Sequence, residues 1–170
     1  MSSSGEKSEE GRTAEAYDEI LANLRDMLKN TSKLTREEFD RALQLAGTSL
    51  DEASKFTREE VEKAQEAVRK DWKQLVKSAN KSKEDFLQSD EFRRISDTTL
   101  GALGRLTKSI KDWASFLDDR IEKQITYHTG EIAGPGTFEC TECGKTLSFK
   151  KSGRIPPCSS CKNTAFRRKI

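Results

Sequence analysis

Residues 136–170 read GTFECTECGKTLSFKKSGRIPPCSSCKNTAFRRKI and contain all four cysteines of the chain. They form two C-x-x-C pairs, Cys140 with Cys143 and Cys158 with Cys161, separated by 14 residues. A C-x-x-C turn lets two sulfurs converge on one metal ion, and four thiolates at tetrahedral positions are a structural zinc site. Four cysteinates also close the coordination shell and leave no position for a catalytic water. The sequence therefore predicts structural Zn²⁺ on these cysteines, with rubredoxin-like iron as the alternative.

The residues between and after the two pairs predict a small antiparallel sheet. TLSFKKSGR reads as a strand, a turn at Ser152-Gly153 and the start of a second strand, and TAFRRKI reads as a last strand. About 35 residues cannot bury a stabilising core, so a bound metal would supply the folding free energy. Two knuckles and three strands make a zinc ribbon, with an apolar shell expected from Phe138, Leu147, Phe149, Ile155 and Phe166.

The two knuckles differ at the residue that follows the second cysteine. Gly144 occupies this position in the first knuckle, where a tight turn benefits from a positive φ. Lys162 and then Asn163 follow in the second knuckle. Asn tolerates the left-handed region but Lys does so less readily, so the second knuckle is the weaker match.

The residues before Gly130 are rich in helix formers and contain neither cysteine nor proline. A first helix is predicted over about 14–29. Two later helices begin with the related sequences KLTREEF and KFTREEV, which start 22 residues apart. Each contains a Thr-x-x-Glu capping box, Thr35 with Glu38 and Thr57 with Glu60, flanked by apolar residues that form a hydrophobic staple. The sequence thus predicts helix starts near residues 36 and 58, in a helical hairpin.

A last long helix is predicted from Asp97 or Thr98 to about Tyr127. Its apolar residues recur every three or four positions over some four heptads, as in a coiled coil or a long bundle helix: Leu100, Leu103, Leu106, Ile110, Trp113, Leu117, Ile121 and Ile125. This seam predicts self-association if no other part of the chain covers it. Acidic residues on the polar side of the helix disfavour attachment to a membrane surface.

These patterns divide the chain into a disordered tail (1–12), a helical region (13–129), a linker (130–137) and a zinc ribbon (138–170). The fold class expected is mainly α, an extended helical hairpin, bundle or coiled coil followed by a small β zinc ribbon. Apolar and charged residues make up 33% and 35% of the 170 residues, which predicts slender helical packing more than a large core. The N-terminal sequence has neither the basic nor the apolar region of a signal peptide, so a cytoplasmic location with reduced thiols is expected.

Basic residues are concentrated in the predicted ribbon. Residues 131–170 contain eight basic and three acidic side chains, a net charge of +5 within a chain of net charge +2. Six of the cations could face a phosphate backbone: Lys150, Lys151, Arg154, Arg167, Arg168 and Lys169. The alternative is that they keep a small domain soluble.

No catalytic constellation is evident in the sequence. His128 is the only histidine, and neither an orienting partner nor a nucleophile is evident near it in the sequence. Phosphate-binding glycine loops and the Gly-x-Ser-x-Gly motif are also absent from the sequence. We therefore expect no enzymatic activity and no small-molecule substrate.

The stretches YHTGEIAGPGTFECTECG and IPPCSSCKNTAFRR resemble the C-terminal part of a family of small bacterial zinc-ribbon-containing proteins. That family has a charged helical N-terminal region and is known mainly as a domain of unknown function. The resemblance extends from Gly130 to Arg168 and implies zinc binding by the four cysteines. It implies no reaction and no partner.

The sequence leaves three functions open. With iron on the four cysteines, the protein would be a rubredoxin-like electron carrier; with zinc, two binding functions are possible. The helices could mediate self-association or bind a protein partner while the ribbon presents a metal-stabilised recognition surface. Alternatively, the ribbon could bind nucleic acid in transcription or translation.

Overall fold

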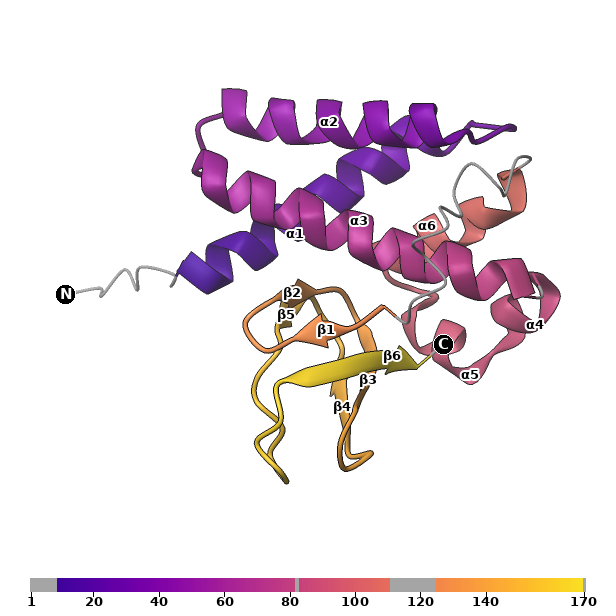
Figure 1. The fold of residues 1–170 in the computed structure, drawn as a ribbon. Helices are drawn as coiled ribbons and strands as arrows, with labels where there is room; N and C mark the ends of the chain where they lie inside the picture. Colours follow the sequence, from indigo (N-terminus) through magenta and orange to yellow (C-terminus); the bar gives the residue numbers. More distant parts are fainter. Residues whose placement is uncertain (1–8, 82, 111–124, 170) are drawn as a thin grey trace.

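The computed structural model describes residues 9–81, 83–110 and 125–169, a helical part followed by a small antiparallel sheet region (Figure 1). The helical elements are α1 (Glu9–Leu28), α2 (Arg36–Glu52), α3 (Arg58–Lys81), α4 (Lys83–Gln88), α5 (Asp90–Ile95), α6 (Thr99–Leu106) and the 3₁₀ turn η1 (Thr107–Ser109). The strands are β1 (Tyr127–His128), β2 (Ile132–Ala133), β3 (Gly136–Cys140), β4 (Thr146–Phe149), β5 (Gly153–Arg154) and β6 (Ala165–Lys169). No helix among these residues is long and apolar enough to cross a bilayer.

Both predicted capping boxes are present. The Thr35 hydroxyl accepts a hydrogen bond from the Glu38 amide, and the Glu38 carboxylate accepts one from the Thr35 amide. Thr57 and Glu60 make the same reciprocal pair at the start of α3. Two otherwise unsatisfied amides are paired at each helix start, which fixes where α2 and α3 begin.

Helices α1, α2 and α3 pack on one another around a common core, which α4 to α6 extend. Phe39 of α2 stacks on Trp72 of α3 with ring centroids 4.7 Å apart. Residues of the predicted first helix, including Tyr17 and Leu24, are fully buried. The prediction of a slender structure with a modest apolar seam is therefore wrong, because three helix faces converge on one core.

The long last helix predicted from residue 97 or 98 to 127 is also wrong. Helix α6 ends at Leu106, where the Thr107 hydroxyl donates to the carbonyl of Gly104. Ile110 then forms a parallel β-bridge with Leu34, and Tyr127 lies in a strand. Leu100, Leu103 and Ile110 are buried in the helical core, so this part of the seam is covered internally. The predicted seam residues Trp113, Leu117 and Ile121, like most of the predicted tail, lie outside the described residues.

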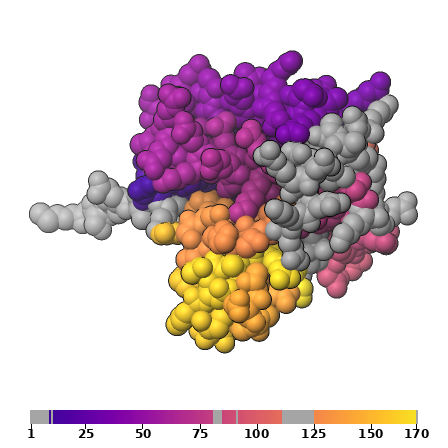
Figure 2. Space-filling view, viewed as in Figure 1, coloured from indigo at the N-terminus to yellow at the C-terminus, as the bar shows by residue number. Residues whose placement is uncertain are grey.

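The sheet is larger than the predicted three strands. Four antiparallel strands follow the order β1-β6-β3-β4, and β2 pairs with β5 in a separate two-stranded ladder. The five predicted apolar residues belong to one cluster, which also contains Ile125, Tyr127, Ala133, Cys140 and Cys158. In Figure 1 the sheet lies below α1 and α3, and β4 is on the side away from the helices. The space-filling view shows the orange-to-yellow strands as a lobe against the helical part (Figure 2).

The stretch 130–137, predicted as a linker, supplies β2 and the start of β3. Residues 132–137 are buried, and β2 contacts both α1 and α3. The glycines in it serve close packing: a Cβ at Gly134 would lie 2.3 Å from the Tyr17 hydroxyl. A Cβ at Gly136, whose φ is +148°, would lie 2.3 Å from an Arg168 nitrogen. We therefore interpret this stretch as a packed junction between the helices and the sheet.

Candidate metal centre

The four cysteines lie at the tips of two backbone knuckles that have the same hydrogen bonds. In the first, the Cys140 amide donates to the Lys145 carbonyl and the Gly144 amide donates to the Cys140 carbonyl. In the second, the Cys158 amide donates to the Asn163 carbonyl and the Lys162 amide to the Cys158 carbonyl. The equivalence places Gly144 and Lys162 at matching positions, and their φ angles are +70° and +64°. Lys162 thus adopts the left-handed conformation that a lysine disfavours.

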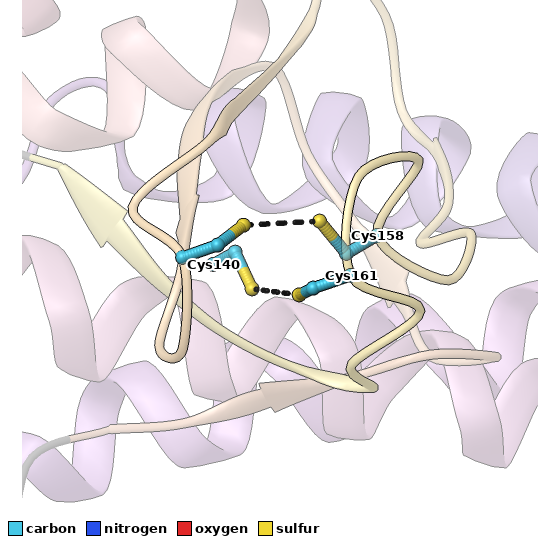
Figure 3. A group of neighbouring side chains, drawn as sticks. Cys140, Cys158 and Cys161 are labelled. Carbon is cyan, nitrogen blue, oxygen red and sulfur yellow. Dashed lines mark hydrogen bonds between the residues drawn. The ribbon is translucent and has the colours of Figure 1, made fainter.

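The knuckles bring the four Sγ atoms to within 4.8 Å of one another. The Sγ–Sγ distance is 3.5 Å between Cys140 and Cys161 and 3.6 Å between Cys143 and Cys158. Figure 3 shows Cys140, Cys158 and Cys161 pointing toward one another from the two turns. Thiolates bound to zinc at ~2.3 Å in a tetrahedron lie about 3.8 Å apart, so this donor set fits the ion.

The surroundings of the thiols favour a cation between them. Hydrogen bonds from the Cys143 amide and from the Asn163 side chain lower the pKa of Cys140 to about 6. A hydrogen bond from the backbone amide of Asn163 lowers the pKa of Cys161. Desolvation and the adjacent sulfurs raise this pKa by more, so the net result is a pKa of about 12. Four thiolates this close repel one another without a metal, whereas a divalent cation would stabilise all four charges.

Asn163 is a part of the centre that the sequence did not identify. Its side-chain nitrogen Nδ2 lies 3.5 Å from Cys140 Sγ, 2.9 Å from Thr141 Oγ1 and 3.1 Å from the carbonyl oxygen of Ala165. The side chain therefore ties the second knuckle to the first and donates to a thiolate, which fixes a ligand's orientation. The sequence signal that could have identified it is an Asn two residues after a C-x-x-C pair.

The centre lies partly at the surface. Cys140 and Cys158 are buried, whereas Cys143 and Cys161 are exposed. The buried pair belongs to the apolar cluster that contains Phe138 and Phe166. The arrangement can hold a metal and brace the ribbon, and four cysteine ligands leave no open coordination position.

The six predicted nucleic-acid-binding residues do not share one surface. Lys150, Arg154, Arg167 and Lys169 are exposed, and Lys169 lies 4.0 Å from the Glu139 carboxylate. Lys151 is exposed as well, but its charge acts on Asp18 of α1.

Arg168 corrects the prediction, because its side chain is only 1% exposed. It alternates with Arg167 along β6, so it points to the opposite face of the sheet. There its guanidinium pairs with Asp71 of α3 at 2.7 Å and lies over the Phe138 ring at 4.5 Å. It also donates to the Pro135 carbonyl at 2.6 Å. The cation cannot reach a phosphate backbone in this conformation.

Asp71 is the centre of a buried hydrogen-bond network that joins the helices to the ribbon. Its carboxylate accepts bonds from the hydroxyls of Tyr17 (2.5 Å) and Tyr127 (2.8 Å), from the Gly134 amide (2.7 Å) and from Arg168 (2.7 Å). Burial and the Asp71 charge raise the pKa of both tyrosines well above 10.0. We call these five residues the Asp71 network.

Three further polar contacts connect the two parts at the edges of the junction. Lys70 pairs with Glu131 at 2.5 Å, and Arg94 donates to Thr137 Oγ1 at 3.0 Å. The Ser152 hydroxyl donates to the Ala14 carbonyl at 3.3 Å. The ribbon is thus attached to α1, α3 and α5 by contacts on several sides.

His128 lies in β1, and its side chain is not part of any cluster of potential metal ligands among the described residues. Its amide donates to Glu131.

The comparisons with known proteins give one match. The family described as zinc-ribbon containing domain matches residues 26–170, which include α2, α3 and the whole ribbon. No curated protein and no solved structure matches the chain. The match extends over both the helical part and the cysteine site, and the two are packed together in the structure. The chain therefore belongs to the zinc-ribbon containing domain family.

Proposed function

We propose that the protein is a non-enzymatic interaction module, in which a structural zinc ion braces a recognition surface on the ribbon. The convergence of four cysteine sulfurs within 4.8 Å carries the proposal. Zinc prefers such a donor set, and a shell of four thiolates supplies rigidity and no reactive water. The helices would hold the ribbon in a fixed orientation through the Asp71 network.

Several features favour a role in protein binding over a role in nucleic-acid binding. Arg168 is buried and paired, which removes one cation from the predicted phosphate-binding set. Lys169 and Lys151 have acidic groups nearby within the chain, Glu139 and Asp18. The exposed cations come from different elements: Arg167 and Lys169 lie in β6, Arg154 lies in β5 and Lys150 follows β4.

The test begins with the metal. Native mass spectrometry of the full chain should show one zinc ion per chain, and the protein should be colourless. A red protein with visible charge-transfer absorption would instead indicate the iron electron carrier. Removal of zinc by a chelator should collapse the dispersed amide signals of residues 136–169 in an NMR spectrum, because the ribbon has too small a core to fold without it.

The second stage tests the interaction. Chemical cross-linking of the zinc-loaded and the metal-free full chain should give partners that need the metal, and each is then confirmed with purified proteins. Partners that bind the metal-free protein equally well would contradict the proposal. So would steady turnover of a substrate that is lost on substitution of a residue other than the cysteines.

A further inference from the structure

Strand β4 has an open edge in the part of the chain that the structure describes. The sheet order β1-β6-β3-β4 puts β4 at one end, where it pairs only with β3. The Cys140 amide bonds to the Lys145 carbonyl, and Phe138 is paired with Leu147. Backbone groups in an antiparallel ladder alternate in direction, so those of Leu147 and Phe149 face β3. Those of Thr146 and Ser148 face outward and are available to another strand.

A small hollow lies beside the first half of β4. It has a volume of about 60 Å³ and is bordered by Leu147, Pro156, Pro157 and Phe166. These four side chains are apolar, and the two prolines have no backbone amide to satisfy; Lys145, Thr146 and Ser159 also border the hollow and make its rim polar. The volume suits one small apolar side chain. In strand addition, backbone hydrogen bonds supply affinity, and such hollows for alternate side chains supply specificity.

Lysines surround this edge. Lys145 precedes β4 and Lys150 follows it, and both are exposed. Lys151, which comes next, already has Asp18 of α1 nearby. Such lysines keep an edge strand from pairing with the same edge of a second copy, because like charges would meet. The same positive charges attract an acidic segment, so the edge should select a negatively charged partner.

We propose that β4 binds an extended acidic segment of a protein partner by strand addition, with one small apolar side chain of that segment in the hollow. The inference rests on the proposed function and names the partner class of the ribbon. The partner strand would bond to the backbone of Thr146 and Ser148, and its carboxylates would lie near Lys145 and Lys150. The zinc site would hold the hollow open, because Cys158 also borders it.

The test uses a displayed library of random twelve-residue peptides, selected on the zinc-loaded full chain. Enriched peptides should contain at least two Asp or Glu residues around a small apolar residue. On binding, hydrogen exchange at the amides of Thr146 and Ser148 should slow. The Ser148→Pro variant removes an amide that faces solvent, a position that an edge strand tolerates, and should weaken binding at least about tenfold. Ser148→Ala is the matched control and should leave binding unchanged.

A second variant covers the case in which Ser148→Pro does not fold. Lys145→Glu combined with Lys150→Glu changes only exposed side chains and should weaken the same peptides at least about tenfold at low salt. Lys63→Glu, on helix α3, is its charge control.

Each other outcome overturns the inference. Peptides that bind Ser148→Pro as well as the natural chain would place the site elsewhere. An absence of enriched peptides would leave the lysines as guards against edge pairing, and self-association lost in Ser148→Pro would make a second copy the occupant. Enriched peptides that bind the metal-free chain equally would contradict the proposed function itself, whereas zinc-dependent peptides insensitive to Ser148→Pro would contradict only the β4 site.

Discussion

Asp71→Asn is the sharpest test of how the helices hold the ribbon. The substitution keeps the size of the side chain but removes the negative charge that faces Arg168. Both side chains are almost inaccessible to water, at 0% and 1% exposure, so water cannot replace the lost partner. An uncompensated buried charge of this kind costs about 3–5 kcal/mol. The Asn amide group also cannot accept all four hydrogen bonds that the carboxylate accepts.

One interaction of Arg168 is unaffected by the substitution. The Arg168 guanidinium lies over the Phe138 ring at 4.5 Å, and a desolvated contact of this type retains about 2 kcal/mol. It is present in both proteins, however, so it limits how far Arg168 moves and does not replace the ion pair. We therefore expect Asp71→Asn to lower the free energy of unfolding by about 3 kcal/mol or more. That is a large part of the ~5–15 kcal/mol that holds a typical domain folded.

The assay is urea unfolding at neutral pH with the free zinc concentration fixed, because metal binding adds to apparent stability. Asp40→Asn is the matched control: Asp40 pairs with Arg36 at 3.6 Å and Arg69 at 3.4 Å but is 41% exposed. This exposed pair should cost about 1 kcal/mol or less. Combining Asp71→Asn with Arg168→Met should recover stability relative to Asp71→Asn alone, since no unpaired cation remains. If Asp71→Asn costs no more than Asp40→Asn, the network does not hold the two parts together.

Three further predictions concern the tyrosines and the metal centre. Tyr17 and Tyr127, the only tyrosines, should give no tyrosinate absorbance at pH 10–11 while the chain is folded. Their folded pKa is raised above 10.0, so their contribution to stability is complete below pH 10 and is lost as pH rises further. Lys162→Gly should raise the stability of the zinc-loaded protein by about 0.5–1 kcal/mol in urea unfolding, because glycine adopts the positive φ without strain. Cys143→Ser should weaken zinc binding in a chelator competition by more than the ~10–100-fold that loss of a ligand's hydrogen-bond partner costs.

Each of the three has a result that counts against it. Normal titration of either tyrosine in the folded chain would mean that its hydroxyl reaches water. Gly144→Ala is the counterpart of Lys162→Gly at the matching position and should lower the stability of the zinc-loaded protein. If both changes shifted stability in the same direction, the two knuckles would not be equivalent. Zinc affinity unchanged by Cys143→Ser would exclude that thiol as a ligand.

The local signals in the sequence predicted local structure well. The two capping boxes are confirmed. They could be predicted because Thr35 and Glu38, like Thr57 and Glu60, are three residues apart, and hydrogen bonds at this distance along the chain need no tertiary context. The spacing of the cysteines likewise predicted two knuckles that converge. The length of the last helix was wrong because apolar spacing alone does not show that Thr107 ends a helix and Ile110 turns toward Leu34.

The junction between helices and ribbon could not be predicted, since it depends on residues far apart in sequence. A signal was nevertheless present. Asp71 lies three residues after Val68 and four before Leu75, on the apolar face of α3, and Arg168 lies two residues after Phe166 on the inner face of β6. An acid and a base on two apolar faces suggest a buried pair, but no pattern indicates that the two faces meet.

The distance along the chain between these partners has a consequence during protein synthesis. Arg168 follows Asp71 by 97 residues. At a translation rate of about 5–20 residues per second, the ribosome adds them in roughly 5–20 s. Throughout that time the nascent helices carry a carboxylate on their apolar face without its guanidinium. Water must hydrate this carboxylate until the last strand arrives, so the face of α3 that packs on the ribbon stays exposed until the ribbon is made. A nascent chain stalled before β6 should therefore be sensitive to protease in α3, and one extended past it should be resistant.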